Sequence, residues 1–286
     1  MILVIGGRSK IGTALIDELV ARGERVRALA RSGAGEQFPG GVEVVSGDLG
    51  DRDSLDRAFA GAEKVFLLCG PREDEVELNR NAIDAAADAD VKLLVRSSIL
   101  GADPDSPSRF MRDHGVCDAY LREADLEHVI VRPNVFSQNV PESTIPSIGE
   151  DGVFYANAGD ARLSMVDTRD VAAVAVALLT SQARAADGVV DVTGPEALSY
   201  DDVAAKLSSS LDRPVRYVDA PDDAVGQALA GYGMPAWLVG GLVELYQDYR
   251  RSGRDGYAAQ LSDAVARLTG RPARTLDDLL AEGGDR

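Results

Sequence analysis

The chain has 286 residues, of which 30 are Lys or Arg and 47 are Asp or Glu, so its formal net charge is −17. Apolar residues make up 45% and charged residues 27% of the sequence, a balance typical of a folded globular protein and not of a disordered or fibrous one. The negative charge argues against nucleic acid as the main partner and against attachment to anionic membranes, since both need a positive surface.

No targeting segment, membrane span, disulfide framework or metal site is expected from the sequence. The apolar start Ile2–Ile5 is too short for a leader and runs directly into Gly6 and Gly7. No apolar run approaches the roughly 20 residues that cross a bilayer. Cys69 and Cys117 stand alone at unrelated positions. We therefore predict a cytoplasmic protein that uses no metal ion.

Short β-branched runs alternate with longer helical patterns along the first two thirds of the chain. The runs predicted as strands are Ile2–Ile5, Arg25–Leu29, Val42–Val45, Lys64–Leu68, Lys92–Arg96 and His128–Val131. The stretches predicted as helices are about Lys10–Arg22, Asp51–Phe59, Asp74–Ala89 and Ser108–Glu123. Several strands are apolar throughout, as in a parallel sheet that helices cover on both faces. The alternation predicts an α/β fold with a Rossmann-type, doubly wound parallel sheet.

The pattern changes after Pro133, where the chain becomes rich in Asn, Pro, Ser and Gly. The elements predicted from there on are a long functional loop at Asn134–Gly159, a helix at about Thr168–Thr180, and strands near Val189–Val192 and Val215–Val218. The rest is mainly helical. We predict a nucleotide-binding domain at residues 1–193, whose loop 134–160 contributes to the cleft, and a smaller, mostly helical substrate lobe at residues 194–286.

A glycine-rich turn between the first strand and the first helix is the strongest motif. The strand ends in Gly6, and Gly12 lies in the first turn of the helix, with Ser9 at the middle position of the G-x-x-G-x-x-G pattern. Backbone N–H groups and the helix dipole of such a turn bind a pyrophosphate, and the missing Cβ atoms permit close approach. The alternative is a turn whose glycines serve packing alone. The predicted phosphate contacts are Gly6, Arg8, Ser9, Lys10, Ile11 and Gly12.

The residue that follows the second strand indicates which cofactor binds. An acidic residue there favours the free ribose 2′-hydroxyl of NADH, whereas arginine favours the 2′-phosphate of NADPH. The strand is followed by Arg31 without an acid, and Arg8 in the glycine turn can reach the same phosphate. The alternative is that both are solvated surface arginines. We predict NADPH as the cofactor, with NADH less favoured.

Two further strand ends are predicted to contact the cofactor. Asp48 and Leu49 follow the third strand, where a carboxylate can accept a hydrogen bond from the adenine amino group. Capping of the next helix is an equal alternative for Asp48. The small residues after the fourth strand would let the backbone approach the cofactor ribose; they are Cys69, Gly70 and Pro71.

The Tyr and Lys pair that ordinary short-chain dehydrogenases carry four residues apart is missing. Tyr120 and Tyr200 are each followed by alanine at that spacing. Tyr246 and Arg250 have the same spacing, with arginine in place of lysine. They lie far along the chain from the predicted nicotinamide end of the sheet. The usual proton donor of these enzymes is therefore absent.

Several short segments nevertheless occur in a characteristic order. They are Gly6–Gly12, Arg31, Gly47–Leu49, Arg96–Ser98, His114–Asp118 with Leu121, Val131–Asn139, Val166–Ala172 and Val192–Tyr200. With this set, which covers nearly the whole length, the chain resembles the NmrA-like family of atypical short-chain dehydrogenases, including its bacterial quinone and azo-dye reductase-like members. The resemblance implies a Rossmann fold, a smaller C-terminal lobe, and a cleft between them that holds NAD(P)H and substrate.

The resemblance also assigns residues to the cleft. It implies that Pro133 and Phe136 lie beside the nicotinamide and that Asn139 faces the cleft. It also implies that Ser97 and Ser98 follow the fifth strand at its ligand-binding end. His114 stands where family members often carry His or Lys, and imidazole can donate or accept a proton near neutral pH. A surface or helix-capping role is the alternative for His114. We take Ser98, His114 and Asn139 as the candidate catalytic residues.

The missing Tyr and Lys pair favours an acceptor that needs little help from a general acid. A quinone that accepts hydride forms a delocalised phenolate, for which electrostatic support from Ser98, His114 or Asn139 can suffice. Residues 232–238 offer an aromatic and thioether surface for a flat substrate, or ordinary packing of the lobe. We predict an NADPH-dependent oxidoreductase that passes hydride to a quinone-like or conjugated carbonyl acceptor, with a homodimer as a further option. The alternatives are a nucleotide-sensing regulatory protein, since the family includes redox sensors, and a dedicated reductase or isomerase of a biosynthetic pathway.

Overall fold

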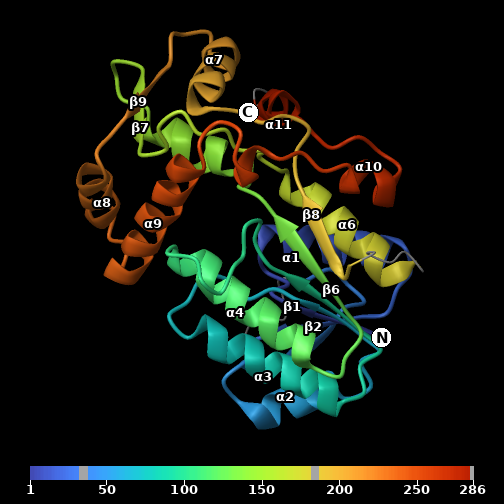
Figure 1. Ribbon diagram of the computed structural model, residues 1–286. Coiled ribbons are helices and arrows are strands. Elements are labelled where there is room, and N and C mark those ends of the chain that lie inside the picture. The colour runs from blue at the N-terminus through green and yellow to red at the C-terminus, as the bar shows by residue number, and fades with distance from the viewer. Residues whose placement is uncertain (32–37, 182–186, 284–286) are drawn as a thin grey trace.

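A parallel sheet forms the centre of the computed structural model, which describes residues 1–31, 38–181 and 187–283. Within these ranges seven strands pair in the order β3-β2-β1-β4-β5-β6-β8 (Figure 1). They are β1 (Ile2–Ile5), β2 (Val26–Ala30), β3 (Glu43–Ser46), β4 (Lys64–Leu67), β5 (Leu93–Ser97), β6 (His128–Pro133) and β8 (Val189–Val192). This is the Rossmann strand order with one strand added, so the predicted fold class is confirmed.

Helices cover the sheet on both faces because the strand residues are apolar on both. The helices α1 (Lys10–Ala21) and α6 (Thr168–Thr180) pack together on one face. The opposite face is covered by α2 (Arg52–Phe59), α3 (Glu75–Asp88) and α4 (Arg109–Glu123), as Figure 1 shows. Alternate residues of β1 join the two resulting cores, with Ile2 and Val4 in one and Leu3 and Ile5 in the other.

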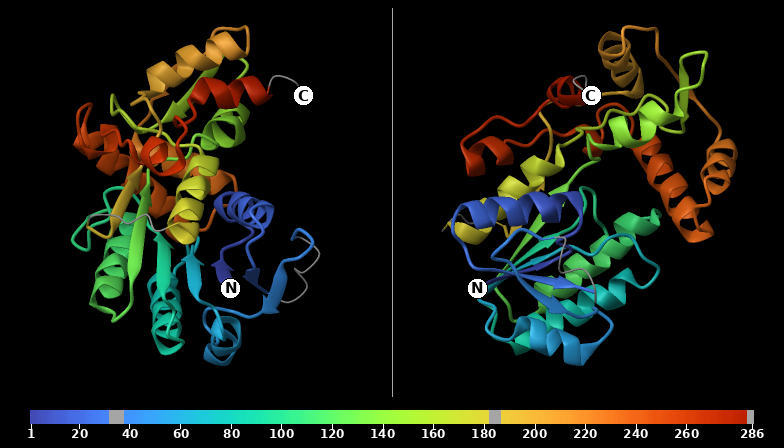
Figure 2. Two further views of the ribbon diagram at one scale, coloured as in Figure 1. Left: turned by 90° about the vertical axis from the view of Figure 1, so that its right-hand side faces the viewer. Right: turned by 180° about the vertical axis from the view of Figure 1, so that it is seen from behind.

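A smaller, mainly helical part stands beyond the carboxyl ends of the strands (Figures 1 and 2). Its elements are α7 (Tyr200–Ser210), β9 (Arg216–Asp219), α8 (Asp222–Gly231), α9 (Ala236–Ser252), η3 (Tyr257–Ala259) and α11 (Leu276–Gly283). Aromatic residues such as Phe154, Tyr200 and Tyr249 form its core. The short helix α10 (Ala264–Thr269) returns to pack on α6. The helical character predicted for this region is confirmed.

The segment predicted as one long loop is more structured than expected. It contains a single π-helical turn, η2 (Val140–Thr144), the short helix α5 (Ile145–Ser147), and a strand, β7 (Val153–Ala156), that pairs in parallel with β9. Because the partner of β7 lies about sixty residues further along the chain, local composition could not reveal the strand. The predicted boundary at residue 193 stays a prediction. No helix in the described ranges is long and apolar enough to cross a membrane.

Candidate active site

The carboxyl edge of the sheet collects the residues predicted to bind the cofactor. In the order of the strands they are Asp48 after β3, Arg31 after β2, Gly6 after β1, Cys69 after β4, Ser97 in β5 and Pro133 in β6. The winding of the chain reverses between β1 and β4, and doubly wound sheets bind ligands at such a switch point. One row of residues therefore runs along the edge on both sides of this point.

The glycines of the turn after β1 are required by close contacts of the backbone. Gly6 has a φ of +81°, and a Cβ atom there would lie 2.4 Å from the carbonyl oxygen of Leu68. A Cβ atom on Gly12 would lie 2.2 Å from the carbonyl oxygen of Gly6. Larger residues cannot occupy either position without moving the backbone. The turn thus lies directly against the end of β4, at the switch point.

The first turn of α1 presents donors to a ligand. Ser9 caps the helix, and its Oγ accepts a hydrogen bond from the N–H of Gly12 at 3.0 Å. This leaves the hydroxyl proton of Ser9 available to a phosphate. The N–H groups of Lys10 and Ile11 precede the first backbone bond of the helix, from Thr13 N to Ser9 O at 2.8 Å. Such amides at the positive end of a helix dipole bind anions, so the turn fits a cofactor diphosphate.

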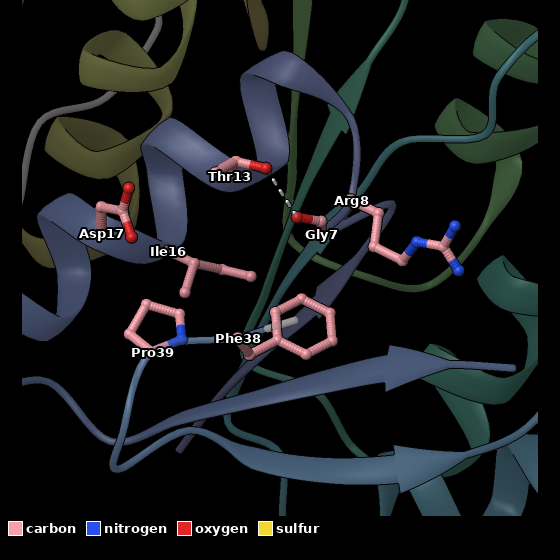
Figure 3. A pocket seen from close by; sticks show the side chains of 7 residues that line it. All are labelled: Gly7, Arg8, Thr13, Ile16, Asp17, Phe38 and Pro39. Atoms are coloured by element: carbon pink, nitrogen blue, oxygen red, sulfur yellow. Dashed lines mark hydrogen bonds between the residues drawn. The ribbon is translucent and has the colours of Figure 1, made fainter. Parts of the chain in front are cut away.

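The guanidinium groups predicted to select NADPH lie at neighbouring strand ends, since Ile5 of β1 is opposite Leu29 of β2. Arg8 and Arg31 are both exposed, and neither pairs with a carboxylate of the described residues. Figure 3 shows that Arg8 extends away from α1, in the direction of the strand arrows. Beside it lies a pocket of about 250 Å³, lined by Gly7, Arg8, Thr13, Ile16, Asp17, Phe38 and Pro39. Both cations are therefore accessible to a phosphate.

The predicted residues after β3 face different environments. Asp48 is exposed, and its Oδ1 accepts a hydrogen bond from the N–H of Gly50 at 2.8 Å. The N-cap position of α2 belongs to Asp51 instead, so Asp48 does not cap that helix. Leu49 is half-buried against the core under α2 and α3. An exposed carboxylate at the end of β3 stays available to the adenine side of a nucleotide.

The residues that follow β4 are small, and one hydroxyl group that follows β5 has no hydrogen-bond partner among the described residues. Gly70 and Pro71 are exposed, while burial raises the pKa of the Cys69 thiol to about 12 and keeps it uncharged. Ser97 is buried at the end of β5. The Oγ of Ser98 is also buried and has no hydrogen-bond partner in the described part of the chain. An unsatisfied hydroxyl at this edge is available to a ligand.

The residues predicted beside the nicotinamide follow β6. Pro133 is buried as the last residue of that strand. Phe136 is half-buried and forms an isolated parallel bridge with Val166. Asn139 is exposed, and its N–H donates to the carbonyl oxygen of Phe136 at 3.0 Å. The Asn139 side chain is therefore placed where solvent or a substrate can reach it.

His114 belongs to a buried polar network that the sequence did not reveal. Arg96, which is fully buried, pairs with Asp118, and its Nε donates to the Oδ1 of Asn79 at 3.1 Å. The Nε and Nη2 of Arg132 donate to the Oδ2 of Asp118 at 3.0 and 2.7 Å. The Nη2 of Arg96 lies 3.1 Å from the Nδ1 of His114. Because a guanidinium can only donate, Nδ1 is the acceptor and the ring proton is on Nε2.

The second nitrogen of His114 faces a buried carboxyl group. Its Nε2 lies 3.3 Å from the Oε1 of Glu75, the first residue of α3. Burial, together with the positive charges of Arg96 and Arg132, holds the pKa of His114 well below its usual value. Burial also raises the pKa of Glu75 to about 7. His114 is therefore a neutral imidazole with both nitrogens directed at protein groups, and its catalytic role stays a prediction.

Comparisons with known proteins agree with this geometry. A protein-family model described as NAD(P)H-binding matches residues 6–182. The NAD(P)H azoreductase of Xenophilus azovorans is 38% identical, over 96% of this chain and 95% of that protein. The (4-alkanoyl-5-oxo-2,5-dihydrofuran-3-yl)methyl phosphate reductase of Streptomyces griseus is 37% identical, over 99% and 97%. The crystal structure of an NADPH-dependent quinone oxidoreductase from Escherichia coli with NADPH has a TM-score of 0.89 at 26% identity, covering 99% of each chain.

The fold and the glycine turn define a dinucleotide-binding protein of the Rossmann class. Within that class, the chain belongs to the NAD(P)H-binding family. The resemblance to NmrA-like, quinone and azo-dye reductase-like short-chain dehydrogenases is confirmed.

Proposed function

We propose that the protein is an NADPH-dependent oxidoreductase that transfers hydride to a quinone-like or conjugated carbonyl acceptor. The observation that carries this proposal is the row of predicted contacts along the carboxyl edge, centred on a turn that fits a diphosphate. The relatives named as an azoreductase and as a reductase of an unsaturated lactone support the reaction class. They also support a small, flat, conjugated substrate.

The residues of the chain would act mainly by positioning. Bound NADPH would supply the hydride. The exposed Arg8 and Arg31 would hold its 2′-phosphate, and the turn at Gly6–Gly12 would hold its diphosphate. The free Oγ of Ser98 and the exposed Asn139 can donate hydrogen bonds to the acceptor oxygen on which negative charge develops. With His114 neutral and engaged, the reduced acceptor would take its proton from solvent.

A second candidate acceptor is an unsaturated lactone that carries a phosphate group. It is favoured by the 37% identity, over nearly the full length of both chains, to the reductase of such a compound. Both acceptors receive hydride at an electron-poor conjugated carbon, so the same cofactor site serves either. In both cases we place the protein in the cytoplasm. Its cysteines Cys69 and Cys117 are unpaired, as is usual for proteins of that compartment.

The test is a turnover assay that follows the nicotinamide absorbance of NADPH with each acceptor. The panel contains benzoquinone, naphthoquinone, an azo dye and an acyl butenolide with and without its phosphate. We expect NADPH oxidation with at least one of them, and a slower rate with NADH as donor. Tight NADPH binding without oxidation by any acceptor would overturn the enzymatic proposal and favour a nucleotide-sensing regulatory protein.

A further inference from the structure

An ion pair joins the phosphate turn to the segment that follows β6. Lys10, the first residue of α1, pairs through its Nζ with a carboxylate oxygen of Glu142 in η2. The two side chains are separated by 132 positions in the sequence, and each is about half exposed, at 50% and 48%. The contact is therefore a tertiary one, formed at a surface that ions and ligands can reach.

The pair connects two separate cores. The residues after Lys10 on α1, such as Ile11 and Leu15, belong to the core beneath α1 and α6. Val140, which begins η2, belongs to the aromatic core of the smaller part of the molecule. Glu142 is thus fixed to one body and Lys10 to the other. Their contact joins the start of α1, which follows the glycine turn, to η2.

Two hydrogen bonds anchor the start of the segment that carries Glu142. The N–H of Ser137 donates to the carbonyl oxygen of Val166 at 2.9 Å, and the Oε1 of Gln138 accepts from the N–H of Thr168 at 3.0 Å. Beyond these bonds Glu142 is exposed. A single π-helical turn presents it, and such turns deviate from the regular helix. The carboxylate can therefore leave Lys10 without breaking the core contacts below it.

The ammonium of Lys10 has two competing anions. The start of α1 attracts negative charge through its free amides and its dipole. Glu142 already places a carboxylate against Lys10 at this position. A cofactor diphosphate held by the turn would also be attracted by this ammonium. Glu142 therefore offsets the positive charge that Lys10 would present to the diphosphate.

We propose that Glu142 is an affinity-determining residue that competes with the cofactor diphosphate for Lys10. Binding of NADPH would break the Lys10–Glu142 pair. The free energy of that pair therefore opposes binding and weakens the affinity for NADPH. The proposal rests on the proposed function, because it takes the glycine turn as the NADPH site. It adds a residue outside the Rossmann domain's glycine motif to the determinants of cofactor affinity.

The experiment is a set of NADPH fluorescence titrations that give the Kd of the full chain. The variants are Glu142→Gln, Lys10→Gln, the double variant, and Glu150→Gln as the control. Glu150 is an exposed acid on the same stretch of chain, so its replacement removes the same charge without touching Lys10. Replacing Glu142 should tighten NADPH binding about two- to fivefold, the range expected of an exposed ion pair.

The double variant decides whether the effect passes through Lys10. We expect Glu142→Gln to change the Kd little once Lys10 is already glutamine, and Glu150→Gln to leave the Kd unchanged. An unaltered Kd in Glu142→Gln, an equal tightening in the Lys10→Gln background, or an equal tightening by Glu150→Gln would each overturn the inference. If the unmodified chain does not bind NADPH at all, the proposed function fails instead, so the two failures are distinguishable.

Discussion

At the scale of single residues, the buried charges on the α3 and α4 side hold that side of the site in one arrangement. Arg96 and Asp118 are fully buried, and Arg132 closes the network from the neighbouring strand. Removing one partner of such a pair leaves an uncompensated charge and costs about 3–5 kcal/mol. Through its contact with Arg96, the network also keeps His114 in one tautomer.

The buried carboxyl group of Glu75 predicts a pH dependence of stability. Its pKa rises from 4.5 to about 7 on folding, mainly because burial penalises the charged form. Protonation of Glu75 therefore raises the free energy of unfolding in full below about pH 4.5. This contribution falls above pH 4.5 and is lost as the pH rises through 7. The charged and titratable groups that face Glu75 are Arg96, His114, Arg109 and Asp113. All four are present in both the parent chain and Glu75→Gln.

Urea unfolding at pH 5 and pH 8 measures this effect for Glu75→Gln. Since glutamine does not titrate, the variant should become more stable relative to the parent chain by about 2–3 kcal/mol between the two pH values. The exposed Glu77 in the same turn of α3 provides the control Glu77→Gln. A difference between Glu75→Gln and the parent that stays the same at both pH values would contradict the assignment.

The choice of cofactor depends on Arg31. Replacing it with aspartate removes a guanidinium and adds an acid that suits a ribose 2′-hydroxyl, so NADPH should weaken relative to NADH by roughly ten- to a hundredfold. Fluorescence titration with both nucleotides gives this ratio. Arg25→Asp changes an exposed arginine before the opposite end of the same strand and serves as the control. An unchanged ratio in Arg31→Asp would show that Arg31 does not select the phosphate.

At the scale of elements, the sequence could predict whatever depends on local patterns. The strands of the central sheet begin and end within two residues of their predicted limits, because apolar runs bounded by turns mark them directly. The pairing of β7 with β9 could not be predicted, since each strand alone is short and its partner is distant. The Lys10–Glu142 contact is hidden for the same reason.

The buried network was also missed, although the sequence carries a signal for it. Arg96 and Arg132 each follow three consecutive apolar residues in an inner strand of the sheet. A charged residue in such a strand needs a buried partner. Asp118 supplies it from α4, but nothing in the spacing identifies that residue before the fold is known.

The start of α7 offers a test of local structure. The Oγ of Ser199 accepts from the N–H of Asp202 at 3.1 Å, and the Asp202 carboxylate accepts from the N–H of Ser199 at 2.9 Å, which forms a complete capping box. Ser199→Ala should therefore lower the free energy of unfolding by about 1 kcal/mol. Ser209→Ala, at the exposed other end of the helix, is the control. Equal effects of the two changes in urea unfolding would rule out the capping role.

At the scale of the whole molecule, the distribution of charge favours one small anionic ligand. Residues 1–50 contain six basic and six acidic side chains, so the remaining 236 residues carry the whole net charge of −17. The exposed cations around the glycine turn stand out against this acidic background, which would repel polyanions such as nucleic acid. The carboxyl edge of the sheet faces the smaller helical part of the molecule (Figure 2).

The most direct measurement of the central claim is a fluorescence titration of the unmodified chain with NADPH, repeated with NADH. We expect saturable binding of one NADPH per chain, tighter than the binding of NADH. Failure to bind either nucleotide would contradict the assignment of the carboxyl edge as the cofactor site.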